Sequence, residues 1–399
     1  MEPQNTIGLA HLSRLAFDGI DLTPLRRALI RDCLHGEDAP SRLMDLSIID
    51  QIHGHTELGL YWQGKALEAQ RSFRTVHEGH ARKSLLVIAQ SGQMGRNTPV
   101  EFLLEQSGFQ VVTFYPGVTD KVLDELPVCD VAFCAAPMDA EDSDQFRKRV
   151  RAFKQDVPVL NFPDDRIDLD RDRLGALFID QPGLRFAATV RATRCALRDL
   201  VHSNVPPEGI ESFPILVRPI GSHAGEGLRK CDSAAELGLY LADRTETEFF
   251  LSEYIDYASP TDRLFRKYRI IFVEGEPYPC HMAIADHWDI WYLNAGMDRS
   301  APKRAEEALF MDQFDSGFAA RHRSSLRILA ERIDLDYFGI DCAEDAEGNL
   351  VVFEADNTLI VHDMDPATVF PYKSAHMQRI FAAFERMLLS RCRPSRPAN

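Results

Sequence analysis

The sequence predicts an α/β protein of more than one domain, and three observations support this fold class. The chain has 399 residues, which exceeds the usual size of one compact domain. Before residue 82 the apolar residues recur mostly at three- and four-residue steps, which predicts helices. Between residues 84 and 161 short apolar runs alternate with a helix-like stretch. This alternation is typical of an open, mostly parallel sheet.

Composition excludes several classes of protein. Apolar residues make up 45% of the chain and charged residues 27%, as in ordinary globular proteins. The formal charge of −16 argues against nucleic acid as the main partner. No apolar run approaches the roughly 20 residues that a membrane-spanning helix needs. Residues 1–5 also lack the basic and apolar segments of a secretory signal. We therefore expect a cytoplasmic protein with no membrane partner.

The eight cysteines contain no CxxC pair, which favours reduced, packed thiols over a disulfide framework or a zinc site. Two pairs of histidines lie in the helical region, namely His53 with His55 and His77 with His80. We expect them to be packed or exposed to solvent rather than to bind a metal.

We expect four regions along the chain. A helical region covers residues 1–81, and a small α/β domain covers 82–163, with strands at 84–89, 110–115, 130–135 and 157–161. A larger domain follows over 174–390, and the basic, proline-rich tail 391–399 is expected to be disordered. The turn from Gly92 to Gly95 lacks the GxGxxG pattern of a dinucleotide site. We interpret it as structural, with a place beside the substrate cleft as the alternative.

A glycine-rich loop follows an apolar run in the larger domain. The run ends at Arg218 and Pro219, and the loop continues through Gly221, Ser222, His223, Gly225 and Gly227. Glycines let backbone amides approach phosphate oxygens, and a nearby cation offsets the phosphate charge. The pattern therefore indicates a phosphate-binding loop, although a hairpin turn with a surface arginine would give the same residues.

An acidic hairpin is predicted near the end of the larger domain. A strand at 337–341 and a strand at 350–356 flank a turn at 347–349. Glu354 and Asp356 stand at alternate positions and share one face, and Asp341 can lie opposite them on the partner strand. Clustered carboxylates suit a hard cation such as Mg²⁺. The alternative is an acidic rim, which acidic proteins often carry.

Taken in order, these segments resemble the ATP-grasp superfamily, which includes D-alanine–D-alanine ligase, glutathione synthetase and ribosomal-peptide-modifying ligases. Two further segments contribute to the resemblance, the Leu251–Ile255 stretch and the strand that contains Arg269. The resemblance covers roughly residues 180–389, and the region before it looks like the smaller domain that precedes an ATP-grasp module. It implies an α+β ATP-grasp fold for the C-terminal domain.

The resemblance also implies roles for individual residues and implies ATP and Mg²⁺ as cofactors. Arg218 stands where the family usually has a lysine, and Arg218 and Arg269 are the implied catalytic residues. Asp341, Glu354 and Asp356 are the implied metal ligands, with Asn357 as the alternative to Asp356. The implied nucleotide contacts are Arg218, Gly221, Ser222, His223, Gly225, Gly227, Glu253, Tyr254, Ile255 and Asp256.

The activity that the resemblance implies is a ligase that joins a carboxylate to an amine through an acylphosphate. A small-molecule kinase on the same scaffold and a non-catalytic nucleotide-binding protein are the alternatives. We expect small-molecule or peptide substrates, and a homodimer is possible because dimers are common among similar enzymes. The candidates for substrate contacts are Arg191, Arg194, His281, Asn294 and His362, each of which could instead serve packing or surface charge.

Overall fold

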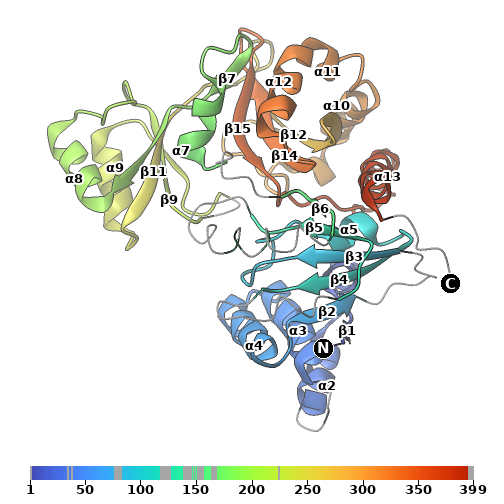
Figure 1. Cartoon of the computed structure of the whole chain (residues 1–399). Coiled ribbons are helices and arrows are strands. Elements are labelled where there is room, and N and C mark those ends of the chain that lie inside the picture. The colour runs from blue at the N-terminus through green and yellow to red at the C-terminus, as the bar shows by residue number, and fades with distance from the viewer. Residues whose placement is uncertain are drawn as a thin grey trace.

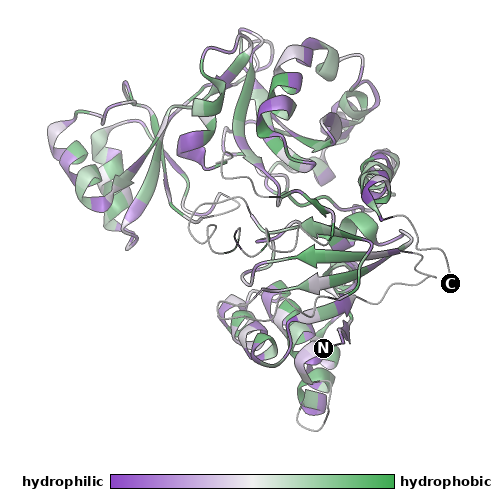
Figure 2. Ribbon diagram, viewed as in Figure 1, coloured by the Kyte–Doolittle hydropathy of each residue, from purple (hydrophilic) through white to green (hydrophobic). Residues whose placement is uncertain are grey.

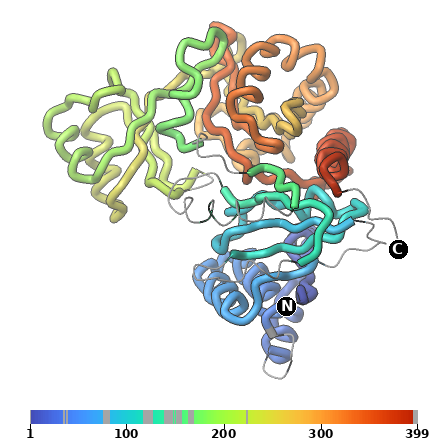
Figure 3. The backbone as a smooth tube through the Cα atoms, in the orientation of Figure 1, coloured from blue at the N-terminus to red at the C-terminus, as the bar shows by residue number. Residues whose placement is uncertain are grey.

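The computed structural model describes residues 2–33, 36, 39–75, 83–116, 127–137, 146, 148, 150, 157–162, 169–222 and 225–393. They form three sheets, and a long final helix packs back against the first one (Figures 1 and 3). One strand of the third sheet, β7 (Leu184–Phe186), precedes the strands of the second sheet in the chain. The mixed α/β class predicted from the sequence is confirmed.

The first sheet has six strands in the order β1-β2-β4-β3-β5-β6. The last four strands along the chain are parallel to one another, as expected for apolar runs buried on both faces. Their bounds lie within two residues of the predicted ones. The strands are β1 (Gln4–Thr6), β2 (Ser72–Thr75), β3 (Lys83–Ile88), β4 (Phe109–Phe114), β5 (Val131–Cys134) and β6 (Val159–Leu160).

Two of these strands belong to the segment expected to be helical. β1 pairs with β2 in parallel, and β2 pairs with β4 antiparallel, so residues before 82 extend the first sheet. Strands of three and four residues are too short to show a period-two pattern, which is why the sequence did not reveal them.

Helices cover this sheet on the N-terminal side (Figure 1). Leu12, Leu46 and Ile49 form the centre of their apolar core. α3 and α4 pack against each other, and α5 follows β3 in the chain. The helices are α1 (Leu9–Phe17), α2 (Thr23–Cys33), α3 (Ala39–Ile52), α4 (Thr56–Ala69) and α5 (Val100–Leu104).

The second sheet has four antiparallel strands in the order β10-β9-β11-β8. Its core centres on Phe249 and Leu251, and α8 (Arg194–Ser203) and α9 (Ala234–Ala242) cover it. The hydroxyls of Thr193 and Ser233 accept hydrogen bonds from backbone amides at the starts of these helices, which fixes where they begin. The strands are β8 (Thr189–Thr193), β9 (Ile215–Pro219), β10 (Arg229–Cys231) and β11 (Glu248–Glu253).

The third sheet has the order β13-β12-β14-β15-β7 and contains the predicted acidic hairpin as β14 and β15. The rings of Phe272 and Phe338 stack in its core with their centroids 4.5 Å apart. The interior strands of the sheets are largely hydrophobic (Figure 2). The strands are β7 (Leu184–Phe186), β12 (Phe265–Val273), β13 (Glu276–Ala285), β14 (Tyr337–Glu344) and β15 (Leu350–Asp356). The helices that accompany the sheet are α7 (Arg171–Leu174), α10 (Ala301–Asp312), α11 (Phe318–Arg321) and α12 (Arg323–Ile333).

The first and third sheets share one hydrophobic core, which α13 (Lys373–Arg391) completes. The ring of Phe384 on α13 meets Phe133 of β5 and Tyr337 of β14, in both cases at 5.2 Å between centroids. A buried polar contact adds to this junction, because the Asn161 side chain accepts a hydrogen bond from the Tyr337 amide at 2.8 Å. The two parts of the chain are therefore joined by packing as well as by the chain connection.

None of the helices in the described ranges combines the length and apolar character that crossing a bilayer would require. Arg391, which we expected in the tail, is the last residue of α13, and residues 394–399 lie outside the described ranges.

Phe384 provides a test of the shared core. Replacing it by Ala should lower the free energy of unfolding by about 3–5 kcal/mol, since a fully buried aromatic ring would leave a cavity. Urea unfolding measures the loss, and Leu389→Ala on the same helix is the control, because that side chain is 48% exposed. Equal losses in both variants would contradict the shared core.

Candidate active site

Four chemically active side chains stand in one row across the third sheet. His281 of β13 pairs with Arg269 of β12, Arg269 pairs with Asp341 of β14, and Asp341 pairs with Glu354 of β15. Directly opposed residues in neighbouring antiparallel strands project from the same face of a sheet. The register therefore gathers these groups although they are distant in sequence.

The centre of the row is a buried ion pair. Arg269 donates two hydrogen bonds to Asp341, from Nε at 2.8 Å and from Nη2 at 3.0 Å. Lys267, two residues earlier on β12, reaches the same carboxylate at 2.7 Å. Burial alone would raise the pKa of Asp341, but the charges of Arg269 and Lys267 outweigh burial and hold this pKa well below its usual value. Asp341 is therefore ionised and fully neutralised by two cations.

Glu354 is held by a residue that the sequence did not suggest. Arg171, on the short helix α7, donates from Nη2 to the Glu354 carboxylate and from Nη1 to the Phe353 carbonyl at 3.2 Å. Arg171 lies before residue 174, where we expected the larger domain to begin. The only signal in the sequence was the cluster of charges around it.

The two remaining candidates for metal ligands, Asp356 and Asn357, differ in their surroundings. Asp356 accepts hydrogen bonds from the amide and the hydroxyl of Thr358, both at 2.8 Å. Burial raises its pKa, and these bonds lower it only in part. Asn357 is completely buried, and its Nδ2 donates to the Ala136 carbonyl of the first domain at 2.8 Å. Asn357 thus anchors the end of β15 to the first sheet through its Nδ2, while its Oδ1 has no hydrogen-bond partner among the described residues. Asn357 therefore stays the alternative to Asp356 as a metal ligand.

A three-carboxylate metal cluster is not formed in the part of the chain that the structure describes, where no three His, Cys, Asp or Glu side chains are placed to hold a metal ion. Asp341 is already paired with Arg269 and Lys267. Glu354 and Asp356 remain as neighbouring carboxylates on one face of β15. Mg²⁺ in nucleotide sites is usually held by one or two carboxylates together with phosphate oxygens, so these two residues fit such an ion.

The glycine-rich loop follows β9 in the second sheet. Gly221, Gly225 and Gly227 have φ angles of 79°, 77° and 65°, which side-chain-bearing residues rarely adopt. Arg218 is 9% exposed and donates from Nε to the Ser222 hydroxyl at 3.2 Å and from Nη2 to the Ser222 carbonyl. His223 lies outside the described residues.

The electrostatics of Arg218 connect this loop to the third sheet. Burial, and next the nearby charge of Arg171, lower the pKa of Arg218 to about 10, while the charge of Glu354 acts in the opposite direction. The side chain of Arg218 on β9 is therefore within electrostatic range of both Arg171 and Glu354.

The Glu253–Asp256 segment continues from β11. The Glu253 carboxylate pairs with Arg185 of β7 at 3.1 Å, which ties the second sheet to the third. Tyr254 lies under the Lys230 ammonium, 4.4 Å from its ring centroid, and burial raises its pKa to about 12. Ile255 is buried, and the side chain of Asp256 is half exposed. Lys230 was not predicted from the sequence, where it is an ordinary strand cation.

Three of the five substrate candidates have structural partners instead. Arg191 pairs with Asp170 and Asp172, and Arg194 donates to the carbonyls of Leu241 and Glu246. Asn294 closes an exposed turn by donating to the Asp289 carbonyl at 2.9 Å. These contacts engage most of their polar groups, although Nη2 of Arg194 has no hydrogen-bond partner among the described residues. That these three residues contact substrate stays a prediction.

The two histidine candidates lie closer to the row. The imidazole of His281 packs on Tyr292 with the ring centroids 4.8 Å apart. Burial first, and then the charges of Arg269 and Lys373, hold the pKa of His281 well below its usual value, so this imidazole is neutral. His362 lies between Phe17 and Phe102 of the first domain, with ring centroids at 6.4 and 6.3 Å.

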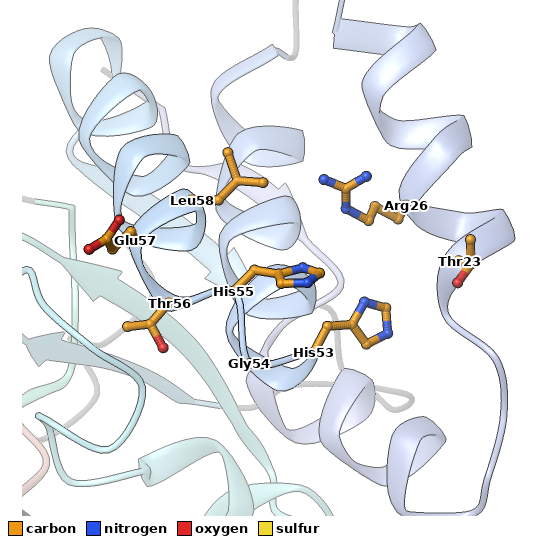
Figure 4. A pocket seen from close by; sticks show the side chains of 8 residues that line it. All are labelled: Thr23, Arg26, His53, Gly54, His55, Thr56, Glu57 and Leu58. Atoms are coloured by element: carbon orange, nitrogen blue, oxygen red, sulfur yellow. The ribbon is translucent and has the colours of Figure 1, made fainter.

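Two surface hollows lie elsewhere, and none of the candidate residues lines either one. The first, of about 620 Å³, is lined by Arg26, His53 and His55 among others (Figure 4). Arg26 there is paired with the buried Asp50 at 2.7 Å, so its guanidinium group neutralises a carboxylate of the helical core. The second, of about 670 Å³, lies against α12 and the end of α13.

The central ion pair yields a stability test. Arg269→Ala should lower the free energy of unfolding by about 3–5 kcal/mol, because the buried Asp341 carboxylate would lose one of the two cations that neutralise it. Chemical denaturation measures this loss. The matched control is Arg327→Ala, whose side chain is 70% exposed and pairs only with Glu331, and it should cost less than about 0.5 kcal/mol. A loss in Arg269→Ala as small as in the control would refute the pairing.

No protein-family model matches the sequence, and no curated protein matches it. Among solved structures, the chain is similar to a RimK-domain ATP-grasp protein from Sphaerobacter thermophilus, with 14% identity, a TM-score of 0.44 and coverage of 77% of this chain and 99% of that one.

It is also similar to D-alanine–D-alanine ligase from Bacillus anthracis in complex with ATP, with 13% identity, a TM-score of 0.42 and coverage of 77% and 96%. A third similar structure is the VanG D-Ala:D-Ser ligase from Enterococcus faecalis, with 12% identity, a TM-score of 0.42 and coverage of 76% and 99%.

Proposed function

We propose that this chain is an ATP- and Mg²⁺-dependent ligase that joins a carboxylate to an amine through an acylphosphate and releases ADP and phosphate. One observation carries the proposal: Arg171 binds Glu354 of the third sheet and lies close enough to Arg218 of the second sheet to lower its pKa. We infer from this proximity that a polyphosphate binds between the glycine-rich loop and the charged row.

The charges of this region support binding of an anion. Four cations, Arg171, Arg218, Lys267 and Arg269, accompany three carboxylates, Asp341, Glu354 and Asp356. The region is thus locally cationic in a chain of net charge −16. Guanidinium groups bind phosphate oxygens in bidentate geometry, and the glycines after Arg218 leave backbone amides accessible to the same oxygens.

Glu354 and Asp356 are the residues proposed to hold Mg²⁺. An ion held by these two carboxylates would supply positive charge that offsets the negative charge of the transferring phosphoryl group. Arg171 would then have to move from Glu354, and the phosphates would offer it a new partner.

The proposed reaction has two steps. An oxygen of the substrate carboxylate attacks the γ-phosphorus of ATP, and ADP leaves with the electrons of the broken bond. The amine nitrogen then attacks the acyl carbon, phosphate leaves, and one proton is released. The chain contributes orientation and charge stabilisation: Arg218 and the loop amides hold the phosphates, and Arg269 lies beside the site of phosphoryl transfer.

The carboxylate substrate, which accepts the phosphoryl group, is proposed to bind beside His281 and the segment that follows β15. Arg269 donates from Nη1 to the Ile360 carbonyl at 3.3 Å, which brings this segment to the row. The same segment ends at His362 against the first domain. The ligand proposed for these parts is a small molecule or a peptide end that carries a carboxylate.

The proposal predicts ADP release that depends on an acid substrate. With ATP and Mg²⁺, a panel of amino acids and short peptides should contain at least one that stimulates release, followed by a coupled ADP assay. Glu354→Gln should lower the stimulated rate by about 100-fold or more, because transition-state charge stabilisation of this kind is worth that much.

Glu331→Gln is the matched control, since Glu331 is an exposed glutamate on α12 that pairs only with Arg327. Its rate should equal that of the unmodified chain. Release stimulated only by a hydroxyl compound would indicate a kinase, and tight ATP binding without release would indicate a non-catalytic nucleotide-binding protein. A chain that does not bind ATP would refute the proposal altogether.

A further inference from the structure

The loop between β3 and α5, residues 91–96, lies at the junction between the first domain and the candidate site. It follows β3 at its carboxyl end, next to the end of β5, since the Thr98 amide donates to the Ala135 carbonyl at 2.8 Å. The Thr98 hydroxyl donates to the Asn357 carbonyl, also at 2.8 Å. Asn357 immediately follows Asp356, so the loop ends within a few residues of the strand end that carries the acidic pair. The carboxyl end of a parallel sheet is where ligands usually bind.

The loop is held by side chains of the N-terminal helices. Gln63 of α4 accepts a hydrogen bond from the Gly92 amide at 2.8 Å and donates one to the Gly92 carbonyl at 3.2 Å. Gln51 of α3 accepts one from the Met94 amide at 2.6 Å, and its own Nε2 donates to the Ser47 hydroxyl at 3.1 Å. A glutamine side chain offers a donor and an acceptor together, so Gln63 replaces the strand partner that Gly92 lacks.

These contacts are what fixes the outer part of the loop. Inside it, one backbone bond joins the Arg96 amide to the Gln93 carbonyl at 3.0 Å. Gln90 and Asn97 exchange two bonds at its base, each of 2.8 Å. Gly95 has a φ of 93°, which glycine adopts readily because it has no Cβ. A glycine at this position does not stiffen the loop. The helices that carry Gln51 and Gln63 are packed together around a common core, so they provide a rigid support.

The residues of the loop favour a negatively charged ligand group. Residues 91–96 read Ser-Gly-Gln-Met-Gly-Arg, with one cation and no acidic side chain. The Arg96 guanidinium is oriented by Gln90, whose Oε1 accepts from Nε at 3.3 Å and from Nη2 at 3.1 Å. An arginine oriented in this way is suited to a carboxylate.

We propose that α3 and α4 act as a support for the active site, in which Gln63 and Gln51 are positioning residues that hold loop 91–96 against a carboxylate-bearing substrate. This inference rests on the proposed ligase function for its substrate, but the clamp itself can be measured without activity. It gives the N-terminal helices a role in substrate positioning that is separate from the roles of the glycine-rich loop and the charged row.

The test uses Gln63→Ala in the full chain. Alanine is a strong helix former, so α4 should keep its fold. Losing these hydrogen bonds should raise the exchange rate of the Gly92 amide hydrogen about 5- to 10-fold, while amides of β3 stay unchanged. In the ADP-release assay the KM for the acid substrate should rise about 10-fold, because positioning is lost, and the KM for ATP should stay within about 2-fold.

Two further variants sharpen the test. Lys65→Ala is the matched control on α4, since Lys65 pairs only with Glu68, and it should change neither measurement. Gln63→Glu keeps the acceptor for the Gly92 amide but cannot donate, so both effects should be partly restored. Unchanged exchange at Gly92 in Gln63→Ala would overturn the clamp. A parallel rise of both KM values would overturn its link to the acid substrate. If the unmodified chain releases no ADP, the ligase itself fails, and the exchange rates still decide whether Gln63 holds the loop.

Discussion

The pairing of Arg269 with Asp341 is the interaction on which the candidate site depends. Both groups are buried in adjacent central strands, where an unpaired charge would cost several kcal/mol. The two-point contact fixes the guanidinium plane, and the register of β12, β13, β14 and β15 then sets His281 and Glu354 on either side. Lys267 adds a second cation to the same carboxylate, so the centre of the row carries surplus positive charge. That surplus turns an acidic hairpin into a region suited to phosphate.

The site is assembled from three parts of the chain that are tied together by a few polar contacts. Arg171 links the acidic end of β15 to the neighbourhood of Arg218, and Arg185 links β7 to Glu253 at the end of β11. Asn357 links the end of β15 to the first sheet through the Ala136 carbonyl. Each of these is a charged or hydrogen-bonded contact rather than a broad apolar surface. The first and third sheets, by contrast, share a continuous core around Phe384, which makes them one rigid support.

The N-terminal helices belong to this support as well. They are joined to the first sheet by β1 and β2, and their glutamines reach the loop after β3. Side-chain amides are effective at such positions because they satisfy backbone groups that have no strand neighbour. The loop thereby gains order without becoming part of the sheet, and Arg96 keeps a defined orientation beside Gln90.

The sequence by itself determined the elements with strong local signals. The buried strands of the first sheet, the glycine-rich loop after β9 and the β14–β15 hairpin were all predicted, because apolar runs, glycines and turn residues act on the chain within a few positions. Only the tertiary structure decided which side chains meet. Arg269 and Asp341 are 72 residues apart, Arg171 and Glu354 are 183 apart, and Asn357 and Ala136 are 221 apart. Pairing over such distances depends on strand register and on the packing of whole sheets, which no local pattern encodes. For the same reason Arg171, Lys230 and Gln63 were missed.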